Sequence, residues 1–266
     1  MKRKSLILVI FNSITLLLML FVNYGSNAGL FSERSVAEIS HKFDTLFAPA
    51  GYAFIIWGFI FLMLITFTVY QWILLKKNDP DNYIQRTGMW LTVSNIANGF
   101  WVSLWTNELL GWSVVIILIL LLSLIILILR LRLELDDEPV RTIFFVWWPI
   151  TFYVGWIMVA TIACISAWLV SVGWKAWGIS ESSWTIIMII IASLFYILLV
   201  MKRNMREALL VGIWAFVAIA IRQWNTHSSI AGTAIAVSLV LFIAVSIHGF
   251  KNRNFGPGSK LKRGEW

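Results

Sequence analysis

Residues 47–61 read FAPAGYAFIIWGFIF, and this stretch decides the fold because a polar segment becomes a long apolar one within it. Proline is tolerated in the first turn of a helix, where its missing N–H would have no partner, and it disfavours helix before it. The apolar run then continues to about Leu75, which exceeds the roughly 20 residues that a helix needs to cross a bilayer core. The stretch therefore predicts a membrane-spanning helix over residues 49–75.

The composition places the whole chain in a membrane. Of its 266 residues 60% are hydrophobic and 13% are charged, against about 25% charged in soluble domains. The net charge of +8 would suit a nucleic-acid partner, but in a membrane protein its meaning depends on which loops hold the Lys and Arg residues. The single cysteine, Cys164, excludes an intrachain disulfide and a cysteine metal site. We expect an integral membrane protein with no nucleic-acid partner.

Seven further apolar stretches predict an all-α fold with eight transmembrane helices. The predicted spans cover residues 5–22, 49–75, 87–107, 111–129, 142–172, 184–201, 208–224 and 229–249. The first, which follows a basic start, fits either a spanning helix or a secretory signal cleaved near residues 26–28. The Ile/Leu run 111–129 is typical of a lipid-facing span. The basic tail, residues 250–266, is predicted to be disordered.

The loop charges test this topology independently, since Lys and Arg concentrate on the cytoplasmic side of a membrane. With the N-terminus inside, 17 of the 21 Lys and Arg residues fall on the inner side, including those of the charged turns 76–86 and 130–141. Only Arg34, Lys42 and two others, Lys175 and Arg222, fall outside. Both termini are predicted to be cytoplasmic, in a multi-pass protein of a cell membrane, most simply the cytoplasmic membrane of a bacterium.

Ionisable residues give few signs of chemistry. The predicted spans hold no charge near their middle, which argues against ion-coupled transport. The three histidines do not form a metal-ligand spacing, and His41 is read as a solvated loop residue or, alternatively, an axial haem ligand. Residues 136–138, Asp-Asp-Glu, are read as a hydrated loop or as a divalent-cation site for an isoprenoid diphosphate. We expect no metal site and no catalytic constellation.

Two helix faces carry the polar and aromatic residues instead. The first face holds Ser94, Asn98, Trp101 and Trp105, and the second holds Tyr153, Trp156, Ala160 and Cys164. Their spacings put each set on one side of a helix. Indole N–H and amide groups need partners within hydrocarbon, so both faces are expected to turn inward. Tight packing and a ligand pocket remain alternative explanations of the pattern.

At these residues the chain resembles the tryptophan-rich sensory protein, or translocator protein, family, also described as peripheral benzodiazepine receptor-like. The family pattern is matched by Pro49, Tyr52, Phe54 and Trp57 in the second span, Asn98 and Trp101 in the third, and Tyr153, Trp156, Ala160 and Thr161 in the fifth. The chain departs from it at Ser94, Phe152 and Cys164, where the family commonly has Gln, Pro and Asn. Residues 23–46 contain no tryptophan, so the resemblance does not extend to porphyrin-degrading chemistry that depends on one.

The resemblance implies a five-helix bundle over residues 1–172, with three additional helices over 173–249. It also implies a homodimer and a pocket for a planar hydrophobic ligand such as a tetrapyrrole, with residues 23–46 as its lid. The pocket would be lined by Trp57, Asn98, Trp101, Tyr153 and Trp156. The matched or neighbouring aromatic and small residues Tyr52, Phe54, Trp105 and Ala160 are expected to complete it.

The sequence thus favours a non-enzymatic membrane receptor, sensor or carrier of a porphyrin-like or other apolar ligand. It holds no permanent cofactor, although porphyrin or haem could be the ligand. A membrane enzyme acting on an isoprenoid or lipid through Asp136 and Asp137 is the second hypothesis. An uncoupled small-solute permease is the third.

Overall fold

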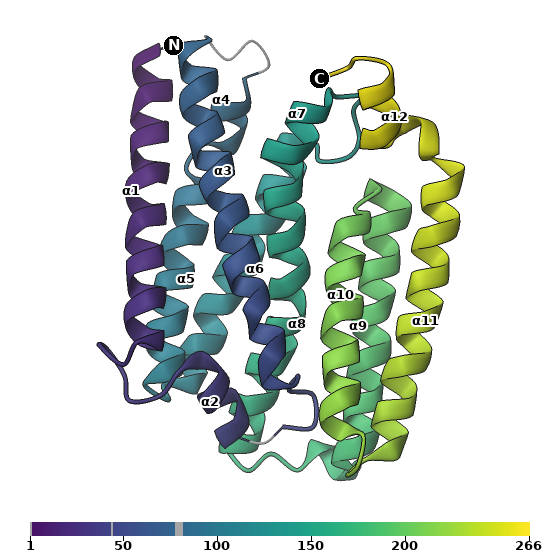
Figure 1. Ribbon diagram of the computed structural model, residues 1–266. Helices are drawn as coiled ribbons and strands as arrows, with labels where there is room; N and C mark the ends of the chain where they lie inside the picture. The colour runs from purple at the N-terminus through teal and green to yellow at the C-terminus, as the bar shows by residue number, and fades with distance from the viewer. Residues whose placement is uncertain (1, 44, 78–81) are drawn as a thin grey trace.

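The described part of the chain, residues 2–43, 45–77 and 82–266 of a computed structural model, folds into helices (Figure 1). The long helices are α1 (Lys2–Asn27), α3 (Ile56–Lys76), α5 (Trp90–Thr106), α6 (Leu110–Leu131), α8 (Trp148–Ser171), α9 (Glu181–Arg203), α10 (Arg206–Gln223) and α11 (Ser228–Lys251). The short helices are α2 (Val36–Lys42), α4 (Tyr83–Thr87), α7 (Val140–Thr142) and α12 (Pro257–Lys262). Single turns lie at Gly51–Ile55, Ile143–Trp147, Ala176–Gly178 and Arg253–Phe255. Residues 78–81 of the predicted charged turn lie outside the described residues.

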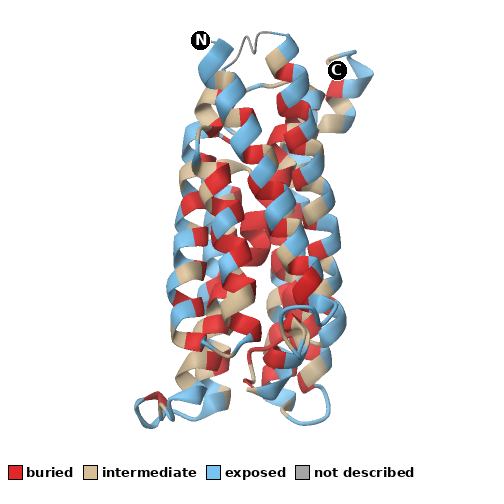
Figure 2. Ribbon diagram, turned by 90° about the vertical axis from the view of Figure 1, so that its left-hand side faces the viewer, coloured by how far each residue is buried: buried red, intermediate tan, exposed pale blue. Residues whose placement is uncertain are grey.

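Six helical segments of the described chain are long and apolar enough to cross a membrane, and the protein is therefore a multi-pass membrane protein. Each of them matches a predicted span. The remaining two predicted spans correspond to α5, with 17 residues, and α10, with 18 residues. Both run alongside the other long helices (Figure 1). Figure 2 shows buried residues between the helices and exposed ones on the outside, where apolar side chains such as Leu17, Leu62 and Leu122 face outward.

Both ends of the chain lie at one end of the bundle, which we call the terminal end (Figure 1). The opposite end, where α2 lies, is the lid end. Helices α1, α3, α5, α6 and α8 form the first group, and α9, α10 and α11 stand on the far side of α8 from α1 and α5 (Figure 1).

Buried amides join the helices of the first group. Asn12 of α1 donates to Gln71 of α3 at 3.1 Å and accepts from Thr92 of α5 at 2.8 Å. Nearer the lid end, Asn23 of α1 donates to Asn98 of α5 at 2.7 Å. Such bonds hold helices together in a membrane, where water offers no alternative partner. Helix α1 is thus packed as a bundle helix, as the spanning-helix interpretation expects.

A glycine lets the second group dock on the first. A Cβ atom built on Gly155 of α8 would lie 2.9 Å from the Cα of Ala208 in α10, closer than real atoms approach. The Tyr196 hydroxyl of α9 donates to the Gly155 carbonyl at 2.6 Å, so this contact joins α8, α9 and α10. Helices α8 and α10 pack closely because residue 155 lacks a side chain.

The second span begins two residues later than predicted. Ala50, which follows Pro49, is not helical, and the chain turns as a 3-10 helix from Gly51 before α3 starts. The Ala50 N–H donates to Ala218 of α10 at 3.1 Å instead of to a helix carbonyl, and the Trp214 indole donates to the Ala53 carbonyl at 3.1 Å. These contacts with α10 hold the first turn in place.

The structure adds a buried face to one helix and corrects the expectation about the tail. Helix α6 exposes apolar side chains such as Leu122 on one side, as a lipid-facing span does, and buries its other face, including Ile117 and Leu120. Ser113 and Ser123, the two serines of the Ile/Leu run, are buried on that face. The tail is not disordered: it forms α12, and Lys260 is buried where it contacts Asp137 and donates to the Glu138 carbonyl at 2.7 Å. Pairing with this acidic loop offsets the charge that suggested disorder.

Candidate functional site

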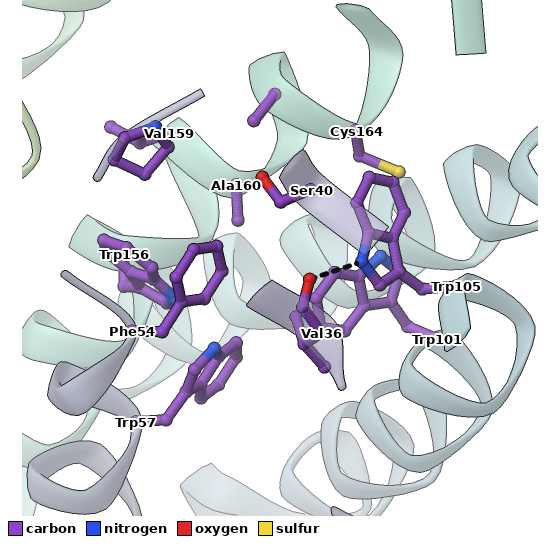
Figure 3. A pocket seen from close by; sticks show the side chains of 12 residues that line it. Val36, Ser40, Phe54, Trp57, Trp101, Trp105, Trp156, Val159, Ala160 and Cys164 are labelled. Carbon is purple, nitrogen blue, oxygen red and sulfur yellow. Dashed lines mark hydrogen bonds between the residues drawn. The ribbon is translucent and has the colours of Figure 1, made fainter. Parts of the chain in front are cut away.

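Aromatic side chains of three helical segments meet beneath α2 at the lid end (Figure 3). Phe54 comes from the 3-10 turn before α3 and Trp57 from α3 itself, Trp101 and Trp105 come from α5, and Trp156 comes from α8. They surround a small cavity of about 30 Å³. We call these five residues the aromatic cluster.

Trp57 is the centre of the aromatic cluster. Its ring centroid lies 6.0 Å from that of Trp101 and 6.4 Å from that of Trp156. Trp101 stacks on Trp105 at 6.0 Å, and Phe54 meets Trp156 edge to face at 5.9 Å. These separations lie in the range of favourable ring contacts, so the cluster forms a continuous aromatic surface.

Asn98 and Tyr153 lie behind this surface and do not line the cavity. The Asn98 amide donates to the Tyr153 hydroxyl at 2.9 Å and accepts from Asn23 at 2.7 Å. Both side chains are fully buried, and the Tyr153 ring lies 6.1 Å from Trp57. Asn98 therefore positions Tyr153, which supports Trp57 from behind.

Of the other predicted site residues, Ala160 lines the cavity and Tyr52 does not. Tyr52 packs edge to face on Trp214 of α10, with ring centroids 5.3 Å apart. Its place in the sequence motif says nothing about α10, which lies far along the chain, and this contact holds the ring away from the aromatic cluster.

Helix α2 forms the roof of the cavity. Ser35 and Glu38 cap its N-terminus reciprocally, with the Ser35 N–H donating to Glu38 at 2.7 Å. This capping starts a helix within the loop. The Trp105 indole N–H donates to the Val36 carbonyl at 3.1 Å (Figure 3), so α2 is bonded directly to the cavity wall.

Two ion pairs hold the same roof from outside. Glu108, between α5 and α6, accepts from Arg34 at 2.7 Å and also pairs with Lys42. The hydrogen bond from Lys42 lowers the pKa of Glu108, and the charge of Arg34 lowers it further. The carboxylate is therefore ionised at neutral pH, and α2 is tied to the tip of the α5–α6 hairpin.

Sequence reasoning missed several residues that line the cavity. Val36 and Ser40 come from α2, and Val159 and Ala163 come from α8. Pro49 and Cys164 also line it, although the sequence suggested a helix start for one and only an inward helix face for the other. The capping pair Ser35 and Glu38 was the available signal that the loop forms a helix.

The cavity is apolar and uncharged, and in the closed structure it is too small for a drug-sized ligand. None of the described residues that line it is ionisable apart from Cys164, and about 30 Å³ matches the volume of one water molecule. The Trp156 indole N–H beside it is buried and has no hydrogen-bond partner among the described residues. A buried donor without a partner is costly, so an acceptor on a ligand would be favourable there.

The acidic loop of the enzyme hypothesis lies at the terminal end, away from the aromatic cluster (Figure 1). Asp136 forms a bidentate pair with Arg132, both distances being 2.8 Å, and Asp137 pairs with Lys260. His41 is exposed on α2 near Gly51 and does not line the cavity. Within the described residues, no group of three or more His, Cys, Asp or Glu side chains is placed to hold a metal ion.

A comparison with known protein families gives a match that covers most of the chain. The family model described as TSPO-like protein matches residues 9–247, a range that runs from α1 into α11. No curated protein and no solved structure matched the chain. The match extends past residues 1–172, to which the sequence motifs are confined, and includes the three C-terminal helices. Because this match covers most of its length, and the aromatic motifs of the second, third and fifth spans meet in one cluster, the chain belongs to the TSPO-like protein family.

Proposed function

We propose that the protein is a membrane receptor, sensor or carrier that binds a planar hydrophobic ligand, most simply a tetrapyrrole, at the aromatic cluster. The observation that carries this proposal is the convergence of four indole rings and Phe54 on one cavity beneath α2. Flat aromatic walls with few polar groups suit a flat apolar ligand. Membership of the TSPO-like family supports the receptor or sensor class.

The ligand must displace α2 to enter. Ligand sites usually enclose roughly 300–1,000 Å³, about ten times the present cavity or more. The rings can separate only if the roof lifts, which requires breaking the bond from Trp105 to Val36 and loosening the ion pairs of Glu108. Helix α2 is then the lid of the site, and the unpaired N–H of Trp156 is available to an acceptor on the ligand.

Fluorescence quenching by protoporphyrin IX tests this proposal. The purified protein in detergent is titrated with the porphyrin, and the same titration is made on Trp101→Phe and Asn98→Ala. Trp101→Phe removes part of the cavity wall, and Asn98→Ala removes the support of Tyr153. We expect saturable quenching, with Trp101→Phe weakening binding about tenfold, as loss of a central aromatic contact does, and Asn98→Ala weakening it less.

Trp177→Phe is the matched control, because this indole is 81% exposed and lies outside the aromatic cluster. It should leave the binding constant unchanged. Linear quenching, or a binding constant that is the same in all four proteins, would show that porphyrin partitions into the detergent and would refute the site.

A further inference from the structure

A second cavity lies between α6, α8 and α9. It borders the face of α8 that is turned away from the aromatic cluster. It encloses about 470 Å³ and is lined by apolar side chains along most of its length. These include Leu121 and Ile125 of α6, Met158 and Ile162 of α8, and Phe195 and Leu199 of α9. We call it the α6–α9 groove.

The groove exists because of how the second group of helices docks. Helix α10 lies close against α8 at Gly155, and α9 reaches the same place through the Tyr196 hydroxyl. Helix α9 otherwise packs on α10 and α11, so its apolar face beside α6 is left uncovered by the described chain. Phe195 and Leu198 are about half exposed there, at 54% and 49%.

The length of the groove fits one leaflet of a bilayer. Its lining on α9 runs from Ala192 to Arg203, which at 1.5 Å per residue is about 17 Å. Half of a hydrocarbon core about 30 Å thick is about 15 Å. An acyl chain of a phospholipid that enters from the terminal end therefore has a groove of matching depth.

The end of the groove is basic. Lys202 and Arg203 close it in the last turn of α9, at the terminal end of that helix. Arg203 donates to the Ile128 carbonyl of α6 at 3.3 Å, which holds its guanidinium across the mouth, and Lys202 is exposed beside it. None of the described lining residues is acidic.

We propose that the α6–α9 groove binds an anionic phospholipid of the leaflet at the terminal end, with one acyl chain in the groove and the headgroup phosphate at Lys202 and Arg203. Guanidinium and ammonium groups bind phosphate by charge and hydrogen bonding. A neutral lipid would fill the apolar part equally well but would leave the two cations without a full negative charge. The proposal does not depend on the ligand of the aromatic cluster.

Native mass spectrometry tests this proposal. The protein is extracted from vesicles that contain equal amounts of phosphatidylglycerol and phosphatidylcholine with identical acyl chains, and the lipids retained per chain are counted. We expect one phosphatidylglycerol to be retained in about tenfold excess over phosphatidylcholine, since two basic side chains contact its headgroup. Lys202→Gln with Arg203→Gln should bring the two lipids to equal retention.

Lys76→Gln with Lys77→Gln is the matched control, because it removes two charges from the end of α3, where no groove residue lies. It should keep the preference. Ile162→Trp fills the groove and should reduce retention of both lipids. If Lys202→Gln with Arg203→Gln does not fold, Lys202→Gln alone should reduce the preference for phosphatidylglycerol, since it changes one exposed side chain. Equal retention of both lipids by the unchanged protein, or equal loss of preference in the control, would overturn the proposal.

Discussion

Glu134 is a residue whose surroundings oppose its charge. It lies in the loop between α6 and α7 at the terminal end, and its charged neighbours are Glu207 and Arg206 of α10 and Lys260 of the tail. Burial and the negative charge of Glu207 raise the pKa of Glu134 to about 8, against the two cations, which lower it. The carboxyl group therefore holds its proton at neutral pH.

This pKa gives the fold a pH dependence of known sign. In the unfolded chain Glu134 loses its proton near pH 4.3, whereas in the folded protein it keeps it until about pH 8. The folded state binds more protons between these values, so stability falls as pH rises through that window. We expect the melting temperature of Glu134→Gln to exceed that of the unchanged protein by a few degrees at pH 9, and the difference to shrink towards pH 5.

Thermal unfolding in detergent, followed by circular dichroism from pH 5 to 9, measures this effect. Glu33→Gln is a suitable control, because it neutralises an exposed carboxylate at the lid end. If the melting temperatures of Glu134→Gln and the unchanged protein differ by the same amount at every pH, Glu134 is ionised in the folded protein and its pKa is not raised.

For single residues, the sequence predicted part of the aromatic cluster and its cavity. The spacing of Trp101 and Trp105 on one helix face and of Trp156 on another placed them inward, and the structure buries all three. Tyr52 was misplaced and Val36 and Ser40 were missed, because their positions depend on α10 and on a loop that folds back over the bundle. Helical periodicity carries no information about either contact.

Helix α2 is the element on which the proposed entry to the aromatic cluster depends. Its fastenings are a hydrogen bond from Trp105 and the ion pairs of Glu108 with Arg34 and Lys42. Exposed ion pairs contribute at most about 1 kcal/mol each and weaken in salt. The fastening of the proposed lid is therefore weak, and we expect its opening to respond to the charge at residue 108.

Cys164 reports this opening, because it is the only cysteine in the sequence, it lines the cavity and it is 1% exposed. We expect a water-soluble maleimide to modify Glu108→Gln about two to five times faster than the unchanged protein, as loss of roughly 0.5–1 kcal/mol from the closed lid implies. High salt should speed the modification of the unchanged protein and have little effect on Glu108→Gln. Both rates are measured by mass spectrometry of samples in which the reaction is quenched at set times.

Glu181→Gln removes an exposed carboxylate at the lid end that does not pair with α2, and it should leave the rate unchanged. Cys164→Ser should abolish the modification. Equal rates in Glu108→Gln and the unchanged protein would mean that the ion pairs do not limit access to the cavity.

The helices were predicted well where an apolar run had clear ends. They were predicted poorly where tertiary contacts determine the order or the buried face of a segment. The six helical segments that qualify as spans agree with the predicted ranges to within a few residues at most ends. The tail was wrong because its order comes from Lys260 and Asp137, which are far apart in sequence. The buried face of α6 was not predicted, because Ser113 and Ser123 are the only polar residues that mark it in the Ile/Leu run.

At the scale of the whole molecule, the two groups of helices form one structure. Helix α10 packs on α8 at Gly155, and it also holds the approach to the second span through Ala218 and the Gln223 amide, which donates to the Leu46 carbonyl at 3.0 Å. The C-terminal helices thus brace the segment that leads from the lid to the aromatic cluster. They leave α1 and α5 uncovered on the far side (Figure 1).

The last prediction concerns α5 and α10, which decide whether eight helices cross the membrane. With 17 and 18 residues they span about 26 and 27 Å, close to a hydrocarbon core of about 30 Å. The charges of α10, Arg206, Glu207 and Arg222, lie near its ends, where they can reach the headgroups. If both helices cross, the lid end faces outward and the terminal end faces the cytoplasm, as the excess of Lys and Arg there predicts.

Single cysteines in a Cys164→Ser background test this topology, with an impermeant maleimide applied to intact cells. Leu109→Cys follows α5 and Asn225→Cys follows α10, and both residues are exposed, so both should react at once. Leu135→Cys and Lys262→Cys, at the terminal end, should react only after the membrane is opened. A protected Leu109→Cys or Asn225→Cys would mean that the helix before it does not cross, because each is separated from the terminal end by that helix alone.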